Sequence, residues 1–260
     1  MSGTTIEAAA QSPASGEGVF ERRFTAIVAA LLCHTTFVVA VGAMFVGLWN
    51  GMGVGIGRLE GSSAWIANTL LLLQFPLFHS LALSSRGRAV MARLVPRGHG
   101  RTLAPTTFAA FAALQALVTF GLWSPSGIEL WRPEGAWYWA WTVPYAGAWI
   151  FLLMALRDGG IGLQSGAIGW QALWAGRAPR FGGMPTSGTF AICRQPIYLG
   201  FALTLWAGPV WTADHLFIAL VWTAYCAIGP ILKERRFRAR YGAAFEDYQA
   251  STPYFLPKIF

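Results

Sequence analysis

Long apolar segments alternate along this chain with short loops that carry almost all of its charges. Crossing the hydrocarbon core of a bilayer as a helix takes about 20 mainly apolar residues. Six segments reach or approach that length, and they predict membrane-spanning helices at residues 24–49, 65–83, 104–123, 137–156, 197–211 and 215–232. Helices are expected because backbone polar groups in lipid must be satisfied within their own segment.

Only Thr212, Ala213 and Asp214 separate the last two predicted spans, so these spans predict a tight antiparallel helical hairpin. The expected fold is all-α, a polytopic membrane protein of about six spans. Residues 1–20 are rich in Ser, Ala, Gly and Thr and predict a disordered cytoplasmic tail. Residues 21–260 predict a single domain.

The composition agrees with a membrane protein and argues against a soluble one. Hydrophobic residues make up 55% of the chain and charged residues 12%, whereas a soluble domain carries about 25% charged residues. The aromatic cluster at the start of the fourth span, Trp137, Tyr138, Trp139 and Trp141, is typical of a membrane–water interface.

The net charge of +8 predicts an orientation in the membrane. With six spans, 17 of the 19 Lys and Arg residues fall on one side, and only Arg58 and Arg132 fall on the other. The side rich in Lys and Arg is the cytoplasmic one. We therefore expect both termini in the cytoplasm, at a bacterial inner membrane, and no nucleic-acid partner.

Cysteine spacing and short motifs exclude several kinds of chemistry. The three cysteines are far apart and form no CxxC pair, so neither a disulfide framework nor a metal site is expected. Phosphate-binding loops, HExxH and Ser-His-Asp patterns are absent from the sequence.

Polar residues gather at the two ends of the predicted hairpin. Arg194 lies just before its first span and Glu234 just after its second, so both must return to the same membrane surface. Tyr198 lies beside them. Either these three residues form part of a site, or the Arg–Glu pair fastens the hairpin ends and the tyrosine is interfacial.

A second polar group stands at the inner end of the second span, where Gln74 and His79 flank Pro76. Polar residues within spans are costly and often functional. The alternative is that His79 is a satisfied interfacial residue.

Aromatic residues mark the C-terminal segment. Phe237, Tyr241, Phe245 and Tyr248 follow one another at spacings of 4, 4 and 3, which predicts an apolar stripe on an otherwise charged helix. This amphipathic C-terminal helix is either a membrane-surface helix or a lid over a cofactor that enters from the cytosol. Residues 163–174 similarly predict an interfacial or re-entrant helix.

Taken in order, these residues resemble the isoprenylcysteine carboxyl methyltransferase superfamily. Its C-terminal signature reads Arg-His-Pro-x-Tyr-x-Gly, a helical hairpin, Glu-Glu, then Phe-Gly-x-x-Tyr-x-x-Tyr. This chain has Arg194-Gln-Pro-Ile-Tyr-Leu-Gly200, the hairpin, Glu234, Tyr241-Gly242, Phe245 and Tyr248. Gln74-Phe-x-x-x-His-Ser80 and Trp123-x-Pro125 resemble the NnrU-like branch, which includes the methanethiol S-methyltransferases. The resemblance covers about residues 70 to 257.

The resemblance implies a membrane-embedded methyltransferase that uses S-adenosyl-L-methionine in a cytosol-facing pocket. Carried over by position, the cofactor-binding residues would be Arg194, Gln195, Pro196, Tyr198, Leu199, Gly200, Glu234 and Arg235. Arg194 would hold the cofactor's carboxylate, and Glu234 its ribose hydroxyls or amino group. Tyr198 would face the sulfonium. His79 would assist ionisation of a thiol acceptor, so His79 and Arg194 are the candidate catalytic residues.

Two of the departures from the signature matter for the chemistry of the site. Gln195 replaces the usual His, and Lys233 replaces the first of the two acidic residues. Gln195 keeps a hydrogen-bonding side chain that cannot titrate, and Lys233 brings a positive charge near a site for a sulfonium. These changes either tune the activity or abolish it.

Three functions are compatible with the sequence. The first is methyl transfer to a small thiol, with methanethiol to dimethyl sulfide as the specific reaction. The second keeps the cofactor and methylates a prenyl-cysteine or another lipophilic, lipid-borne acceptor. The third is a non-catalytic membrane subunit or transporter, against which the spans carry few charges and no inverted repeat. The oligomeric state and the pathway cannot be predicted from the sequence.

Overall fold

The computed structural model describes residues 18–255, and helices dominate it. The N-terminal half contains α1 (Val19–Trp49), α2 (Gly61–Ala82), α3 (Ser85–Arg93), the 3-10 turn η1 (Pro96–Gly98) and α4 (Gly100–Gly121). The C-terminal half contains β1 (Glu129–Trp131), α5 (Gly135–Ala140), α6 (Thr142–Asp158), α7 (Ile161–Gln164), α8 (Ala167–Trp174), α9 (Thr189–Ile192), α10 (Pro196–Trp206), β2 (Trp211–Thr212), α11 (Ala213–Tyr241) and α12 (Ala243–Ser251). Of the predicted tail, residues 1–17 lie outside the described part.

Within residues 18–255, five helical segments are long and apolar enough to cross a membrane: α1, α2, α4, the α5–α6 pair and α11. α10 is apolar but has only 11 residues. At about 1.5 Å per residue it is too short to span the hydrocarbon core alone. The expected all-α, polytopic membrane fold is therefore confirmed, with the predicted fifth span present as this shorter helix.

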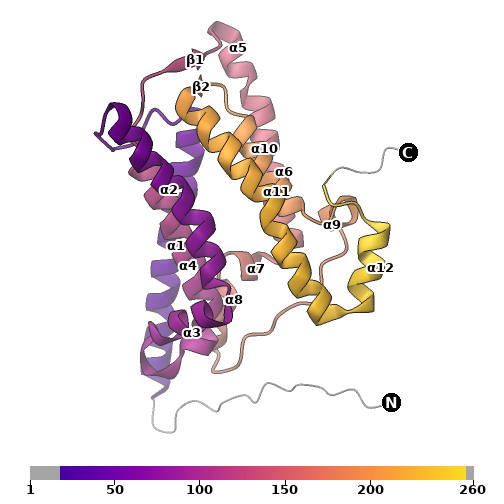
Figure 1. Cartoon of the computed structure of the whole chain (residues 1–260). Coiled ribbons are helices and arrows are strands. Elements are labelled where there is room, and N and C mark those ends of the chain that lie inside the picture. Colours follow the sequence, from indigo (N-terminus) through magenta and orange to yellow (C-terminus); the bar gives the residue numbers. More distant parts are fainter. Residues whose placement is uncertain (1–17, 256–260) are drawn as a thin grey trace.

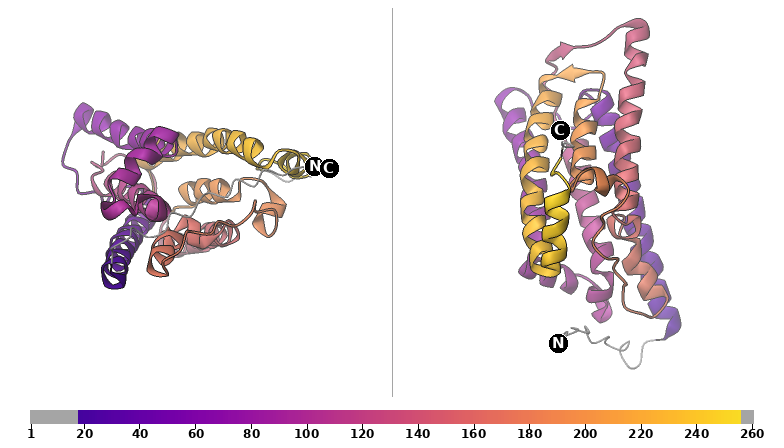
Figure 2. Two further views of the ribbon diagram at one scale, coloured as in Figure 1. Left: turned by 90° about the horizontal axis from the view of Figure 1, so that it is seen from below. Right: turned by 90° about the vertical axis from the view of Figure 1, so that its right-hand side faces the viewer.

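The helices form an elongated bundle whose long elements run between two ends (Figure 1). α4 packs against α1 and α2, while α10 packs against α6 and α11, and α11 also contacts α2. The views in Figure 2 place α12 beside the lower part of α11. The core between these helices is apolar, and fully buried Leu48, Leu72, Trp123, Tyr145 and Ile218 lie within it.

Apolar side chains also cover much of the outer surface. Leu31 and Leu32 of α1, for example, are 62% and 65% exposed. A water-soluble protein this size rarely exposes so many large apolar groups, whereas a lipid environment requires them. The structure is therefore that of an integral membrane protein.

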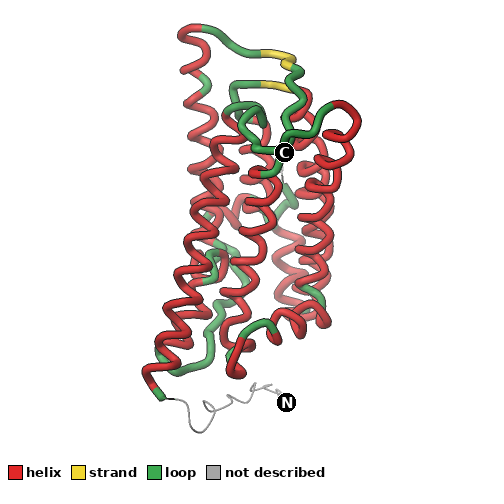
Figure 3. The backbone as a smooth tube through the Cα atoms, turned by 90° about the vertical axis from the view of Figure 1, so that its left-hand side faces the viewer, coloured by secondary structure: helices red, strands yellow, loops and turns green. Residues whose placement is uncertain are grey.

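The hairpin between α10 and α11 is less tight than predicted. α10 ends at Trp206, because Pro209 disfavours helical backbone for the residue before it. The chain then forms β2, which pairs antiparallel with β1, so that Trp131 lies opposite Trp211. Figure 3 shows this two-stranded ribbon at the end of the bundle opposite the start of α1.

Buried polar pairs join neighbouring helices. Gln74 on α2 donates hydrogen bonds of 2.9 Å to the Gln115 carbonyl and to Thr119 Oγ1 on α4. Asp214, at the start of α11, accepts hydrogen bonds from the Trp123 indole and the Ser126 backbone. Such contacts help to fix helix packing in lipid. Gln74 is thus part of the helix–helix interface.

The region after the fourth span folds back onto the bundle. Instead of one helix over residues 163–174, the chain forms α7 and α8, separated by Gly166 in a left-handed conformation at φ 77°. α8 packs on α1 and α4. The Trp170 indole donates a 2.9 Å hydrogen bond to His34 Nε2.

The C-terminal aromatic stripe lies on two helices instead of one. Gly242 has φ +52°, which interrupts the helix between Tyr241 and Ala243. α12 folds back, so that Phe245 is 1% exposed and Tyr248 is 9% exposed. The ring of Phe245 contacts those of Phe237 and Tyr248. This stripe therefore packs inward on the protein.

Candidate functional site

The candidate site lies where the start of α10, the end of α11, α12 and the C-terminal segment meet. α9 precedes it and is held by Asp158 at the end of α6. Asp158 Oδ2 accepts hydrogen bonds from the Thr189 backbone N–H at 2.8 Å and from its hydroxyl at 3.0 Å. Gly188 has φ +61°, and a Cβ there would lie 2.3 Å from Asp158 Oδ2. Only glycine fits at this turn.

Glu234 is the centre of a hydrogen-bonded cluster. Its Oε1 accepts from Arg194 Nε at 2.9 Å and from Gln195 Nε2 at 2.7 Å. Its Oε2 accepts from Gln249 Nε2 at 3.1 Å. Both side chains of the Arg194–Glu234 ion pair are 10% exposed. The predicted meeting of these two residues is confirmed, and both hairpin ends are joined through one carboxylate.

Arg194 also fastens the C-terminal segment. Its Nη1 donates to the Gln249 carbonyl at 3.1 Å and to the Thr252 carbonyl, and its guanidinium lies 5.6 Å from the Tyr254 ring centroid. Backbone contacts add to this attachment, since the Arg194 N–H donates to the Pro253 carbonyl at 2.8 Å. Residues 249–254 thus cover the start of α10.

Lys233 lies on the inner side of the cluster. Its Nζ donates a 3.0 Å hydrogen bond to Gln195 Oε1. Three aromatic rings surround the same nitrogen, with centroids at 5.2 Å for Phe237, 5.5 Å for Phe190 and 5.9 Å for Tyr198. These distances allow cation–π attraction. The site therefore already holds one cation between aromatic faces.

Burial raises the pKa of three groups near the C-terminal segment. It raises the pKa of the Cys193 thiol, which is fully buried. It also raises the pKa of Tyr248 and that of Tyr254 to about 12 each. The Tyr248 hydroxyl donates a 2.6 Å hydrogen bond to the Phe190 carbonyl. All three groups are therefore neutral at physiological pH, and Cys193 is no thiolate nucleophile there.

The other residues predicted to bind the cofactor differ in their position relative to the Glu234 cluster. Pro196 is buried at the first position of α10, and Leu199 is partly buried one turn later. Gly200 packs against α6, since a Cβ there would lie 2.9 Å from the Leu152 Cα. Arg235 is exposed, and no hydrogen bond or ion pair found within residues 18–255 includes it. Gly200 is thus a helix-packing residue, and Arg235 lies outside the cluster.

His79 lies apart from the cluster, in an aromatic slot on α2. Its ring stacks on Phe75 at 5.1 Å and contacts Phe108 at 4.9 Å, and its Nδ1 is buried without a hydrogen-bond partner among the described residues. Phe75 in turn contacts Tyr225 of α11. His79 therefore reaches α11 through aromatic rings, and among the described residues no hydrogen bond or ion pair found joins it to Arg194 or Glu234.

Some residues of this site carry no signal in the sequence. Gln249, Thr252 and Tyr254 contribute through the C-terminal segment, and each supplies a backbone carbonyl that any residue could supply. Phe190 is an ordinary apolar residue until the fold places it beside Lys233. Lys233 differs from the family signature, but its contact with Gln195 depends on the fold.

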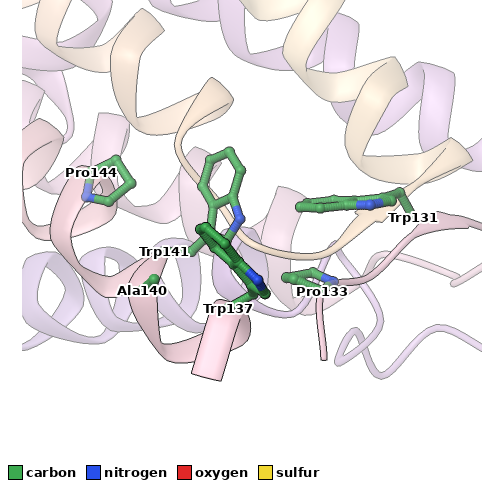
Figure 4. Close-up of a pocket in the computed structure, with 6 residues that line it drawn as sticks. All are labelled: Trp131, Pro133, Trp137, Ala140, Trp141 and Pro144. Carbon is green, nitrogen blue, oxygen red and sulfur yellow. The ribbon is translucent and has the colours of Figure 1, made fainter. Parts of the chain in front are cut away.

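An aromatic hollow lies at the other end of the bundle (Figure 4). It is lined by Trp131, Pro133, Trp137, Ala140, Trp141 and Pro144. Trp137 and Trp139 are 75% and 69% exposed, as expected of rings at a membrane–water interface. Since its lining carries no ionisable group, this hollow is no candidate for catalysis.

The fold and the charged cluster define the class: a polytopic helical membrane protein with a buried charged cluster where α11 meets α12. Comparison with curated proteins then gives its relatives. The chain is 29% identical over 249 residues to methanethiol S-methyltransferase 2 of Bradyrhizobium diazoefficiens, covering 90% of this chain and 89% of that protein. It is 24% identical over 254 residues to the methanethiol S-methyltransferase of a Pseudomonas species, covering 92% and 93%.

A third similar protein is the methanethiol S-methyltransferase of Mycobacterium tuberculosis, which is 24% identical over 257 residues. No family model matches the chain, and no solved structure matches it. The similarity to these curated proteins nevertheless extends over nine-tenths of the chain. It confirms the resemblance to the branch that includes the methanethiol S-methyltransferases.

Proposed function

We propose that this protein is a membrane-embedded methyltransferase that transfers a methyl group from S-adenosyl-L-methionine to a small thiol, converting methanethiol to dimethyl sulfide. The observation that carries this proposal is the similarity over most of the chain to several proteins that bear the same name, methanethiol S-methyltransferase. Methyltransferase relatives imply a methyl donor, and S-adenosyl-L-methionine is the donor we propose.

The chemistry of the Glu234 cluster fits such a donor. S-adenosyl-L-methionine has a cationic sulfur, an amino-acid group and ribose hydroxyls. The cluster offers aromatic faces for a cation, a guanidinium for a carboxylate, and a carboxylate for hydroxyls or an ammonium. Glu234 Oε2 accepts only one hydrogen bond among the described residues, so it has capacity for a second.

We assign the donor-binding surface to Arg194, Gln195, Pro196, Tyr198, Leu199 and Glu234. Gly200 supports this surface through its packing on α6, and Arg235 stands beside it on α11. We further propose that this end of the bundle faces the cytoplasm, together with both termini, at a bacterial inner membrane. The positions of the Lys and Arg residues support that orientation.

When bound, the donor supplies a methyl group on positively charged sulfur. The protein's contribution is then to position the two reactants and exclude water from them. Arg194 and Glu234 fix the donor's polar groups, and Tyr198 presents a ring to the sulfonium. The thiol must also lose its proton, since the thiolate is the nucleophile. His79 is one candidate to assist this ionisation, and Lys233 is a second.

The test begins with the detergent-purified protein. Calorimetric titration with S-adenosyl-L-methionine measures donor binding, and headspace analysis after addition of methanethiol measures dimethyl sulfide. We expect both. Donor binding without dimethyl sulfide would keep the methyltransferase and discard the acceptor. Absence of binding by folded protein would favour a non-catalytic membrane protein.

A matched pair of variants tests the site. Glu234→Ala removes the carboxylate of the cluster, and we expect it to abolish methyl transfer in protein that remains folded. Glu246→Ala removes an exposed carboxylate on α12 and serves as the control. Unchanged turnover of Glu234→Ala would reject this assignment of the site.

A further inference from the structure

Among the described residues, Lys233 is a partly buried cation that forms no ion pair. No Asp or Glu oxygen among residues 18–255 lies within 4 Å of its Nζ, and Gln195 Oε1 is the one acceptor found there for its three N–H groups. Phe190, Tyr198 and Phe237 occupy much of the remaining space around it. Only one of its three N–H groups therefore donates to an oxygen among the described residues, which leaves hydrogen-bonding capacity for a ligand beside the rings.

This environment is unfavourable for an isolated ammonium ion. Removing a charge from water is costly unless it is paired, and cation–π contacts recover only part of that cost. An anion bound at Nζ would offset that cost. The surrounding rings are apolar, so an anion with a small apolar substituent fits this place better than a strongly hydrated one.

We propose that the Lys233 ammonium binds the acceptor as its thiolate and so activates it for methyl transfer. This inference rests on the proposed function and names a catalytic residue for it. The thiol S–H bond breaks and its proton passes to water. The thiolate lone pair then forms the new S–CH3 bond while the donor's CH3–S bond breaks, and that electron pair stays on the donor's sulfur. Lys233 remains an ammonium throughout.

Other charged and titratable groups face Lys233. They are Glu234 and Arg236 on its own helix, Cys193 before α10, and Tyr198 on α10. Arg194, Gln195 and Gln249 all donate to Glu234, so its charge is already shared among other partners. The donor's own carboxylate is the competing anion for Lys233, and the experiment must separate it from a thiolate.

The test compares Lys233→Met, which removes the charge at similar length, with Lys233→Arg, which keeps it. The acceptors are methanethiol and 2,2,2-trifluoroethanethiol, a small thiol that is more acidic because of its fluorines. We expect Lys233→Met to lower kcat/KM for methanethiol about 10- to 100-fold, which corresponds to one or two pKa units of the bound thiol. The loss for the acidic thiol should be several-fold smaller, and Lys233→Arg should retain most activity.

A second readout does not depend on turnover. Thiolates absorb in the ultraviolet, so the ionisation of methanethiol bound beside S-adenosylhomocysteine can be titrated directly. Wild-type protein should ionise it at lower pH than Lys233→Met does. Equal losses for the two thiols, or unchanged ionisation, would overturn the proposal. Weaker donor binding with unchanged ionisation would assign Lys233 to the donor's carboxylate instead.

The two proposals fail in different ways. Wild-type protein that binds the donor but methylates no thiol refutes the proposed function. If wild type forms dimethyl sulfide and Lys233→Met forms it equally fast, only the role of Lys233 is refuted.

Discussion

Lys233 Nζ donates a 3.0 Å hydrogen bond to Gln195 Oε1, so two of the residues that depart from the family signature contact each other. The Gln195 amide lies between Lys233 and Glu234, which fixes its orientation. Its oxygen accepts from the Lys233 ammonium, and its Nε2 donates to Glu234 at 2.7 Å. The two departures therefore form one coupled arrangement.

This contact predicts that substitutions at positions 195 and 233 affect donor binding non-additively. Lys233→Glu alone would place a carboxylate against Gln195 Oε1 and beside Glu234, and donor binding should weaken. Adding Gln195→His supplies a protonated imidazole that can donate to both carboxylates. Residues in contact typically couple by about 0.5–3 kcal/mol, so the double variant should bind the donor about 2- to 150-fold more tightly than the two single variants predict. Calorimetry on all four proteins measures this, and strict additivity would contradict it.

Gly188 offers a test of how α9 is held. In Gly188→Ala the new methyl group would meet Asp158 Oδ2 in a left-handed backbone conformation, and the Asp158–Thr189 contacts should break. We expect a loss of about 1–3 kcal/mol in stability, measured as a lower Tm in detergent. Gly182→Ala in the same loop is the control, because nothing lies within 4 Å of its Cβ position. Equal Tm values for the two variants would refute the steric argument.

The sequence predicted the bundle well for a physical reason. Helices that face lipid must be long and apolar, so their composition reports their position directly. The meeting of Arg194 and Glu234 was also predictable, since a hairpin returns its two ends to one surface.

The tail and the site interior were less accessible to prediction. The stripe from Phe237 to Tyr248 has helical spacing, yet Gly242 divides it at φ +52° and turns α12 back on the protein. The docking of residues 252–254 uses backbone carbonyls, which leave no pattern in the side chains. The position of Lys233 between three rings depends on α9, α10 and α11 together.

Arg194 should hold the C-terminal segment, residues 249–254, on the start of α10. Arg194→Lys keeps the charge but cannot bond Glu234, Gln249 and Thr252 at once. Loss of charge-assisted hydrogen bonds worth about 1.5–3 kcal/mol each should open the tail locally. Cys193, which is now buried, should then react with a maleimide at least about tenfold faster. Arg235→Lys, at an exposed position, is the control. Equal labelling rates of the two variants would argue against the attachment of the C-terminal segment by Arg194.

His79→Phe separates packing from proton transfer on α2. The new ring can keep the contacts with Phe75 and Phe108, while both nitrogens are lost. Because Lys233 is the proposed activator of the thiol, we expect kcat/KM for methanethiol to stay within about threefold of wild type, a change of less than 1 kcal/mol. A loss greater than tenfold, confined to methanethiol and smaller for an acidic thiol, would return that role to His79.

Alkaline pH should release the C-terminal segment. Burial raises the pKa of Cys193 above its usual value of 9.0 and that of Tyr248 from 10.0 to about 12. For both groups the folded state favours the neutral form, so their stabilising effect is complete below the usual pKa and is lost as the pH rises toward the folded one. Tm should therefore fall from about pH 9 upward. Cys193→Ala should flatten the first part of that fall, and a Tm independent of pH between 9 and 12 in the wild-type protein would contradict the burial of these groups.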